Sequence, residues 1–213
     1  MTRRIATAES QNLWESHKRQ SIQDAVIRLM CREGLQSVTM ERVAQEVGIA
    51  KGTVYLHYRD KQQLLDEVKD SALDPLVERI GEVVGAGSTP ERTLHAYALR
   101  YLTYFDESRD LFRILLYERE VTRVSGKRYQ SGRYRKLVEF AAGAIREGIH
   151  SGDFREVDAR LVSAMFVDSI VAIVNQRLLT DKPAAVENDA ALIADIFIRG
   201  MASESAQRRR SAR

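Results

Sequence analysis

The chain has 213 residues, of which 44% are hydrophobic and 30% are charged. This balance is typical of a soluble globular protein long enough to bury one large core or two small ones. The formal net charge of +3 does not by itself indicate a nucleic-acid partner, and the single cysteine, Cys31, excludes an internal disulfide and fits a reducing cytosol. Because there is no signal peptide and no apolar run of transmembrane length, we expect a cytoplasmic protein with no membrane partner.

Three prolines and long stretches rich in Ala, Leu, Glu and Arg predict an all-α fold. Residues 1–10 are expected to be disordered, followed by a helix from about Ser10 to Glu33 that Gly34 ends. Cys31 lies next to the inward stripe of this helix and is interpreted as a small packing residue. The stripe consists of Ile22, Ala25, Val26, Leu29 and Met30.

Residues 39–61 predict two short helices separated by a tight turn. Thr39 is the expected N-cap of the first helix, Glu41 lies in its first turn, and Gly48 is the glycine expected just past its end. The apolar residues of this helix recur at helical spacing: Met40, Val43, Ala44 and Val47. A glycine-containing turn between two such helices is typical of a helix-turn-helix, whose second helix lies in the DNA major groove.

The second helix offers a polar face that suits DNA. Val54 and Tyr58 are four residues apart and can face inward, which leaves Lys51, Thr53, Tyr55 and His57 available to the outside, with Gly52 among them in the chain. Lysine and histidine can meet phosphates, threonine can reach a phosphate or a base edge, glycine permits close backbone approach, and tyrosine offers a ring and a hydroxyl. An ordinary helical hairpin with a solvated polar face fits the same pattern.

The order and spacing of these residues resemble the TetR family of bacterial transcriptional regulators over about residues 19–68. The matching positions are Gly34-Leu35, Val38-Thr39-Met40, Val43-Ala44, Val47-Gly48-Ile49, Lys51-Gly52-Thr53-Val54-Tyr55, His57-Tyr58, Lys61 and Leu64. The resemblance implies a phosphate contact from Thr39, a recognition helix that carries Lys51, Gly52, Thr53, Tyr55 and His57, and a backbone contact from Lys61. Ala50 departs from the family, which often has a capping serine there; alanine cannot cap, so one phosphate contact is missing.

Charge over the implied DNA-binding domain is nearly balanced. Residues 1–68 hold ten Lys and Arg against nine Asp and Glu, so DNA binding must depend on where the positive charges lie. Arg3 and Arg4 either form an arm that touches the DNA or belong to a solvated terminus.

A helix is expected from Lys61 to about Gly85, with Asp60 as its N-cap and a kink or break at Pro75. Thr89-Pro90-Glu91 then starts the first of five further helices, near 90–107, 109–122, 128–150, 158–180 and 187–204, the fourth with Asp158 as its expected cap. We therefore expect three parts: a DNA-binding domain with an N-terminal arm over 1–68, a ligand-binding and dimerisation domain over 69–205, and a basic tail over 206–213.

In the resembling family the second domain encloses a ligand, so several of its residues are candidates for binding a small-molecule inducer. The aromatic residues Tyr97, Tyr101 and Phe105 are ordinary core by default but can line such a cavity. Asp168 and Asn175 share one helix face and need polar partners, which lie across a dimer, inside the chain or on a ligand. Between residues 119 and 136 seven Lys and Arg face one Glu, which can attract an anionic ligand such as an acyl-CoA or a nucleotide, or be a solvated face.

Two C-terminal helices are expected to form a homodimer. Residues 161–179 are apolar nearly all round, and residues 190–201 are also strongly apolar, so both should be buried on more than one side. The family dimerises through its last two helices, and such a pair can form a four-helix interface about a two-fold axis. The residues expected in this interface are Met165, Ile170, Val174, Ile193 and Phe197.

Catalysis has little support in the sequence. The four histidines are scattered without metal-ligand spacing, and there is no Gly-rich phosphate loop or nucleophile elbow, so we expect neither an enzyme nor a cofactor. The predicted function is a repressor that binds a palindromic double-stranded DNA operator as a dimer and is released by an inducer. An activator with the same DNA-binding domain, a non-specific architectural DNA binder and a small-molecule enzyme are the alternatives.

Overall fold

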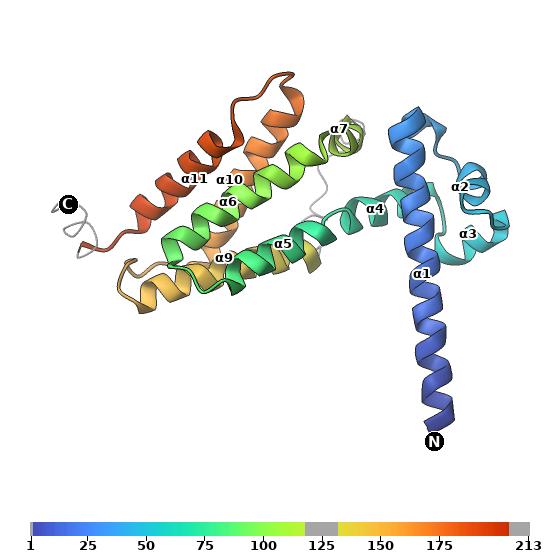
Figure 1. The fold of residues 1–213 in the computed structure, drawn as a ribbon, viewed down its shortest axis with the longest axis horizontal. Coiled ribbons are helices and arrows are strands. Elements are labelled where there is room, and N and C mark those ends of the chain that lie inside the picture. Colours follow the sequence, from blue (N-terminus) through green and yellow to red (C-terminus); the bar gives the residue numbers. More distant parts are fainter. Residues whose placement is uncertain (1, 118–131, 205–213) are drawn as a thin grey trace. The chain divides into compact units, whose positions relative to one another are not determined.

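The computed structural model describes residues 2–117 and 132–204, which are helical with no β-strand among them (Figure 1). An isolated β-bridge joins Phe154 and Ala202. The all-α prediction is therefore confirmed. The chain divides into two compact units: the first holds residues up to Ala72 together with the short segment that begins at Ile114, and the second holds Leu73–Arg113 and the described residues from 132 on.

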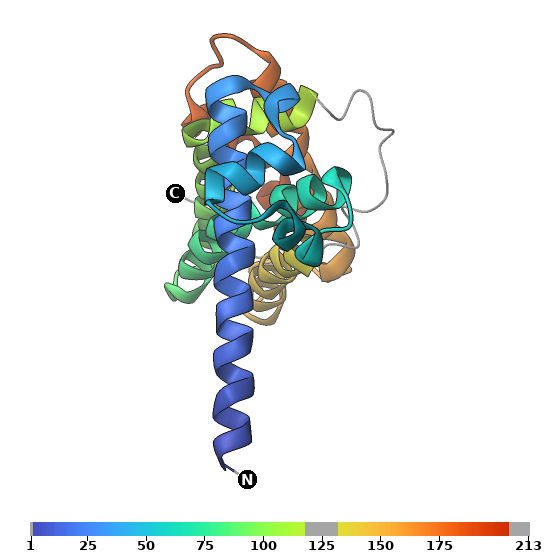
Figure 2. The same ribbon diagram turned by 90° about the vertical axis from the view of Figure 1, so that its right-hand side faces the viewer.

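The first unit comprises five helical elements. They are α1 (Thr2–Glu33), the short 3-10 helix η1 (Leu35–Ser37), α2 (Met40–Val47), α3 (Lys51–His57) and α4 (Lys61–Ser71). Helices α2 and α4 pack against α1, and α2 packs against α3. Within this unit the N-terminal half of α1 extends beyond the other helices (Figure 2). The predicted inward stripe of α1 is confirmed, because its five side chains are no more than 1% exposed.

Two expectations for α1 are wrong. Residues 2–10 are helical, because they contain neither glycine nor proline and consist largely of residues that tolerate a helix well. Cys31 is exposed, because one further residue turns the helix about 100° away from the buried Met30.

The predicted helix starts are confirmed by their hydrogen bonds. Asp60 accepts from the Gln63 amide at 2.8 Å and Asp158 accepts from the Leu161 amide at 3.0 Å. The predicted break at Pro75 is also confirmed: α4 ends at Ser71, and α5 (Asp74–Gly85) has the proline in its first turn. A proline is tolerated there because the first amides of a helix have no partner inside the helix.

The second unit contains α5, four further described helices and the first part of another, α7, as far as Arg113. They are α6 (Pro90–Glu107), α7 (Arg109–Tyr117), α9 (Gly132–His150), α10 (Ala159–Leu179) and α11 (Val186–Met201). Helix α6 packs against α5, α9, α10 and α11. The five predicted segments agree with these helices to within a few residues, where they fall on described residues. Most of the basic 119–136 segment and the basic tail over 206–213 lie outside the described residues.

Helix α10 is long and apolar enough to cross a membrane by length and composition alone, which corrects the expectation that no run reached that length. Packing against α6, α9 and α11 accounts for its apolar character. Its Asp168 accepts a hydrogen bond from the Tyr134 hydroxyl at 2.9 Å, and its Arg177 is paired with carboxylates inside the unit. These are the contacts of a core helix.

A polar cluster around Arg177 joins three helices of this unit. The Arg177 side chain is only 6% exposed and forms ion pairs with Asp106 of α6 and Asp189 of α11. Its guanidinium also donates to the Ala184 carbonyl at 2.9 Å. Hydrogen bonding to Asp106 raises the Arg177 pKa further above its usual range. Arg109 of α7 donates to the carbonyls of Arg177 and Thr180, so the end of α10 is held from two sides.

Candidate DNA-binding site

The turn between α2 and α3 is fixed by backbone geometry. The Thr39 hydroxyl accepts from the Arg42 amide at 3.2 Å, which caps α2 as predicted. Gly48 ends α2 with φ +77° and ψ 34°, a left-handed conformation that glycine adopts without strain, and its amide donates to the Ala44 carbonyl at 2.9 Å. No atom lies within 4 Å of a Cβ built at Gly48, so the glycine is required by its backbone conformation and not by space.

Two buried side chains orient α3. Val54 and Tyr58 are 0% exposed, which confirms the predicted inward pair. The Tyr58 hydroxyl accepts from the Gln23 side chain of α1 at 3.2 Å, and burial raises the pKa of this hydroxyl. Ala50 makes no side-chain cap, as its residue type requires. The register of α3 is therefore set from the inside and from its C-terminal end.

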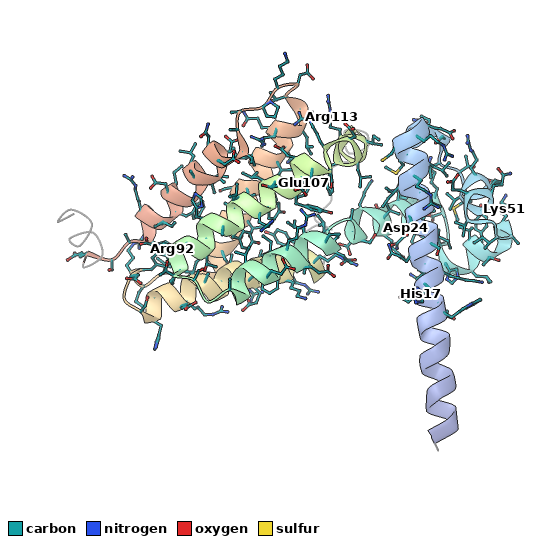
Figure 3. All side chains as sticks on the ribbon, in the orientation of Figure 1. His17, Asp24, Lys51, Arg92, Glu107 and Arg113 are labelled. Atoms are coloured by element: carbon teal, nitrogen blue, oxygen red, sulfur yellow. The ribbon has the colours of Figure 1, made fainter. Side chains whose placement is uncertain are left out.

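The opposite face of α3 is open to solvent. Lys51 and Gly52 are exposed, Tyr55 is 46% exposed, and Thr53 and His57 are half-buried. Figure 3 shows Lys51 among the side chains around α2 and α3. The predicted recognition residues thus lie on one short helix, with Lys51 and Tyr55 the more accessible side chains and Thr53 and His57 closer to the body of the unit.

Leu56 is a candidate contact that sequence reasoning missed. Its side chain is 84% exposed, although leucine is apolar. The signal was present in the sequence: with Val54 and Tyr58 inside, a residue two positions from each lies about 200° round the helix and faces outward. An exposed leucine beside Tyr55 offers an apolar surface for a thymine methyl group.

Electrostatics on this face centre on Lys51. Its ammonium forms an ion pair with the Glu41 carboxylate of α2, and it also lies 5.6 Å from the centre of the Tyr55 ring. The hydrogen bond to Lys51 lowers the pKa of Glu41, and the same bond raises the pKa of Lys51. Lys51, the exposed cation of α3 that is expected to contact DNA, is therefore already paired with the carboxylate of Glu41.

A polar belt holds the C-terminal end of α3. Arg19 of α1 donates to Glu67 of α4 at 2.9 Å and to the carbonyl of His57 at 3.5 Å, and its guanidinium lies 5.5 Å from the Tyr58 ring centre. On α4, Gln63 donates to Glu67 at 3.1 Å and accepts from the backbone amide just after Tyr58 at 2.9 Å. This belt, defined by Arg19, Gln63 and Glu67, ties the recognition helix to both α1 and α4.

The other two predicted contacts lie on either side of α3 in the chain. Thr39 is exposed at the start of α2. Lys61, at the start of α4, is half-buried and its ammonium lies 3.5 Å from the carbonyl of Leu35. Together with the exposed face of α3, these residues offer hydrogen-bond donors and cations for phosphates and a mixed polar and apolar surface for base edges.

The candidate ligand residues of the second unit are part of its packed interior. Tyr97 is fully buried, its hydroxyl donates to the Leu137 carbonyl at 3.0 Å, and its ring meets Phe166 edge-on at 5.5 Å. Tyr101 is 3% exposed and stacks on the half-buried Phe105 at 5.5 Å. Asp168 has an internal partner, Tyr134, which was one of the open alternatives, and Asn175 is half-buried. In the part of the chain that is described, no group of three or more His, Cys, Asp and Glu could hold a metal ion.

Three of the five predicted interface residues are buried within a single protomer. Ile170, Val174 and Ile193 are between 0% and 6% exposed within a single protomer, so they belong to its own core. When a helix is apolar on all sides, its sequence does not indicate which face packs against the other helices of the same unit. Met165 is 53% exposed and Phe197 is half-buried, packing edge-on against Phe166 at 5.3 Å. The exposed apolar residues of α10 and α11, which we call the outer apolar face, are Leu161, Met165, Leu179, Leu192 and Ile196.

Residues 22–68 match the family model of the bacterial regulatory proteins of the tetR family. These residues contain the helix-turn-helix just described, from the buried stripe of α1 to α4. Together with the relatives below, this match supports the TetR family for this chain. The recognition made from the sequence is thereby confirmed, including the boundaries of the matching region to within a few residues.

TetR-family relatives resemble the chain well beyond this domain. The HTH-type transcriptional repressor KstR2 of Rhodococcus jostii is 27% identical over 159 residues, which cover 73% of this chain and 77% of the relative. The fatty acid metabolism regulator protein of Bacillus subtilis is 21% identical over 166 residues, covering 78% and 86%. The structure of the regulator FadR from Bacillus subtilis in complex with stearoyl-CoA superposes with a TM-score of 0.69 at 19% identity, covering 85% of this chain and 98% of that one.

These relatives are transcriptional regulators, two of them named for repression or for the control of metabolism. The superposed structure establishes a common two-domain helical fold. The comparisons accordingly support a DNA-binding transcriptional regulator, and the chain has a helix-turn-helix domain followed by a helical domain.

Proposed function

We propose that this TetR-family protein is a cytoplasmic repressor that binds a palindromic operator as a homodimer and is released by a small-molecule inducer. The observation that carries the proposal is the exposed face of α3, where Lys51, Tyr55 and Leu56 project from a helix whose register is fixed by buried Val54 and Tyr58. Rigid presentation of a few side chains is what base readout in a major groove requires.

The homodimer is supported by the outer apolar face. Leu161 and Met165 are four residues apart on α10, and Leu192 and Ile196 are four apart on α11, so each pair lies on one side of its helix. All four are between 53% and 60% exposed in the protomer. Contact between two copies of this face would bury apolar area and place two recognition helices in one molecule, matching half-sites about one helical turn or more apart.

The inducer is proposed to bind inside the second unit, against the aromatic row of α6 and the Asp168–Tyr134 pair. Relatives that regulate fatty acid metabolism, and the relative solved with stearoyl-CoA, make acyl-CoA thioesters the first class to test. Such a ligand releases DNA only to the extent that it binds more tightly to the conformation that does not fit the operator.

The decisive experiment selects bound sequences from random duplex DNA with the purified protein. The expected result is a palindromic consensus, bound at moderate salt with an affinity about a thousandfold or more above that for a scrambled duplex. Equal affinity for both duplexes would identify a non-specific DNA binder instead. A panel of acyl-CoA thioesters of increasing chain length is then tested for release of the selected duplex, and mass spectrometry of the incubated thioesters detects any turnover that would indicate an enzyme.

A further inference from the structure

The ion pair between Glu41 and Lys51 lies on the surface that is proposed to face DNA. Glu41 is in the first turn of α2, two residues after the capping Thr39, and Lys51 is the first residue of α3. Both side chains are 51% exposed, so the pair is open to solvent and to an approaching phosphate. The lowered pKa of Glu41 and the raised pKa of Lys51 keep both groups charged at neutral pH.

A carboxylate at this position opposes DNA binding in two ways. The N-terminal end of a helix attracts phosphate through its free amides and its dipole, but Glu41 occupies the first turn of α2 with a negative charge. In addition, Lys51 cannot be fully shared with a phosphate while it remains bonded to Glu41. A DNA phosphate must therefore compete with the Glu41 carboxylate for Lys51.

We propose that Glu41 competes with DNA phosphate for Lys51 and thereby lowers the affinity of this protein for duplex DNA of any sequence. This inference rests on the proposed function, because it assumes that the face of α3 meets DNA. Phosphate contacts position a protein on DNA without reading its sequence, so the competition acts on operator and non-operator duplexes alike. In the cell this competition would lower the fraction of the regulator that is bound to the large excess of non-operator sites.

The charge distribution of the first unit gives this competition its weight. Residues 1–68 carry a net charge of only +1, so the attraction of this unit for DNA depends on individual cations at the DNA-facing surface, of which Lys51 is one. Other cations of the unit are paired away from α3: Arg28 and Arg32 of α1 with Glu46, and Arg42 with Glu33. Releasing Lys51 from Glu41 should therefore change DNA binding more than releasing an arginine from Glu46.

The test is a fluorescence-anisotropy titration of full-length variants against the selected operator and a scrambled duplex, at several salt concentrations. Glu41→Gln should raise affinity for both duplexes by about threefold per DNA-binding unit, and steepen the slope of log affinity against log salt by about 0.9 per unit. Glu46→Gln is the control, because it removes the same charge from the same helix together with ion pairs to Arg28 and Arg32 that lie away from α3. The Glu46→Gln variant should bind both duplexes with affinities within about twofold of the parent, and its salt slope should match that of the parent.

The double variant decides whether Glu41 acts through Lys51. If it does, Glu41→Gln should have a clearly smaller effect in a Lys51→Met background than in the parent, whereas direct repulsion of DNA by Glu41 predicts an undiminished effect and overturns the proposal. Unchanged or weakened binding by Glu41→Gln, a gain on the operator alone, or an equal gain from Glu46→Gln would each overturn it as well. A parent protein that shows no preference for the operator would instead refute the proposed function, so the two failures are distinguishable.

Discussion

Each unit of this protein contains an ionic contact between residues of different helices, and the two contacts differ in burial. The Lys51–Glu41 pair is about half exposed at both ends, whereas the Arg177 side chain is 6% exposed between two carboxylates and a carbonyl. An exposed pair can exchange a partner for a phosphate at little cost, because water solvates the released group. A buried arginine cannot be separated from its partners without leaving uncompensated charge. An ion pair can therefore be exchanged for a DNA contact in the first unit, whereas in the second unit it stabilises the fold.

The largest expected effect comes from removing the buried cation. Arg177→Ala leaves Asp106 and Asp189 facing each other without their guanidinium, and should lower the free energy of unfolding by about 3 kcal/mol, as measured by urea denaturation. Arg113→Ala is the control, since Arg113 pairs at 3.7 Å with Asp181, whose side chain is 91% exposed, and its loss should cost no more than about 0.5 kcal/mol. Similar values for the two variants would show that burial does not separate the two kinds of contact.

Charges placed on the outer apolar face should separate the protomers without unfolding them. Met165→Glu combined with Ile196→Glu puts four carboxylates into a two-fold interface, so light scattering should report a monomer and operator affinity should fall by about a hundredfold or more. Ala86→Glu combined with His95→Glu adds the same number of carboxylates at exposed positions outside α10 and α11, and should leave the dimer intact. A persistent dimer in the first variant would place the interface elsewhere.

Truncation of the exposed tyrosine should act on the DNA contact alone. Tyr55→Ala is expected to weaken operator binding by about 1–3 kcal/mol in a gel-shift titration, with an unchanged melting temperature, because the side chain is 46% exposed and its loss opens no cavity. Leu56→Ala should cost about 1 kcal/mol if the leucine meets a thymine methyl. Gln62→Ala, an exposed position on α4, is the control. Full operator affinity in Tyr55→Ala would remove this residue from the site.

The smallest expected effect tests the belt that holds the end of α3. Arg19→Lys keeps a positive charge beside Glu67 but cannot also reach the His57 carbonyl with a second donor, so operator binding should weaken by about 0.5–1 kcal/mol at constant stability. Glu67→Gln retains a side chain that can bond Gln63, and should cost no more than Arg19→Lys. An operator affinity equal to that of the parent in both variants would show that the buried Val54 and Tyr58 position the helix without the belt.

Much of the fold and of the DNA-binding surface could be predicted from local pattern. Caps at Thr39, Asp60 and Asp158, the left-handed Gly48 and the break at Pro75 each depend on a few neighbouring residues, so their physics is contained in a short window of sequence. The recognition helix followed in the same way, because buried Val54 and Tyr58 fix which side faces outward. The same reasoning predicts that Leu56 faces outward. Leu56 was overlooked because an apolar residue is not usually expected at an exposed position.

Helix α10 shows where local pattern stops. Its residues are apolar on nearly every side, so periodicity gave no direction, and Ile170 and Val174 were expected in an interface although both lie in the core of their own protomer. Met165 and Leu161 on the same helix are exposed. The difference is made by α6, α9 and α11, which cover one side of α10 and leave the other open.

By itself the sequence determined most of the helices and their ends, the resemblance to the TetR family and the outward side of α3, because each depends on residues within a turn or two of one another. Tertiary structure alone decided the partners of the charged groups. Lys51 meets an acid ten positions earlier, and Arg177 meets acids 71 residues before it and 12 after it. Such pairs form only when separate helices pack together, and their interaction energies depend on how much water the packing excludes. Neither quantity can be predicted from the helical periodicity of the sequence.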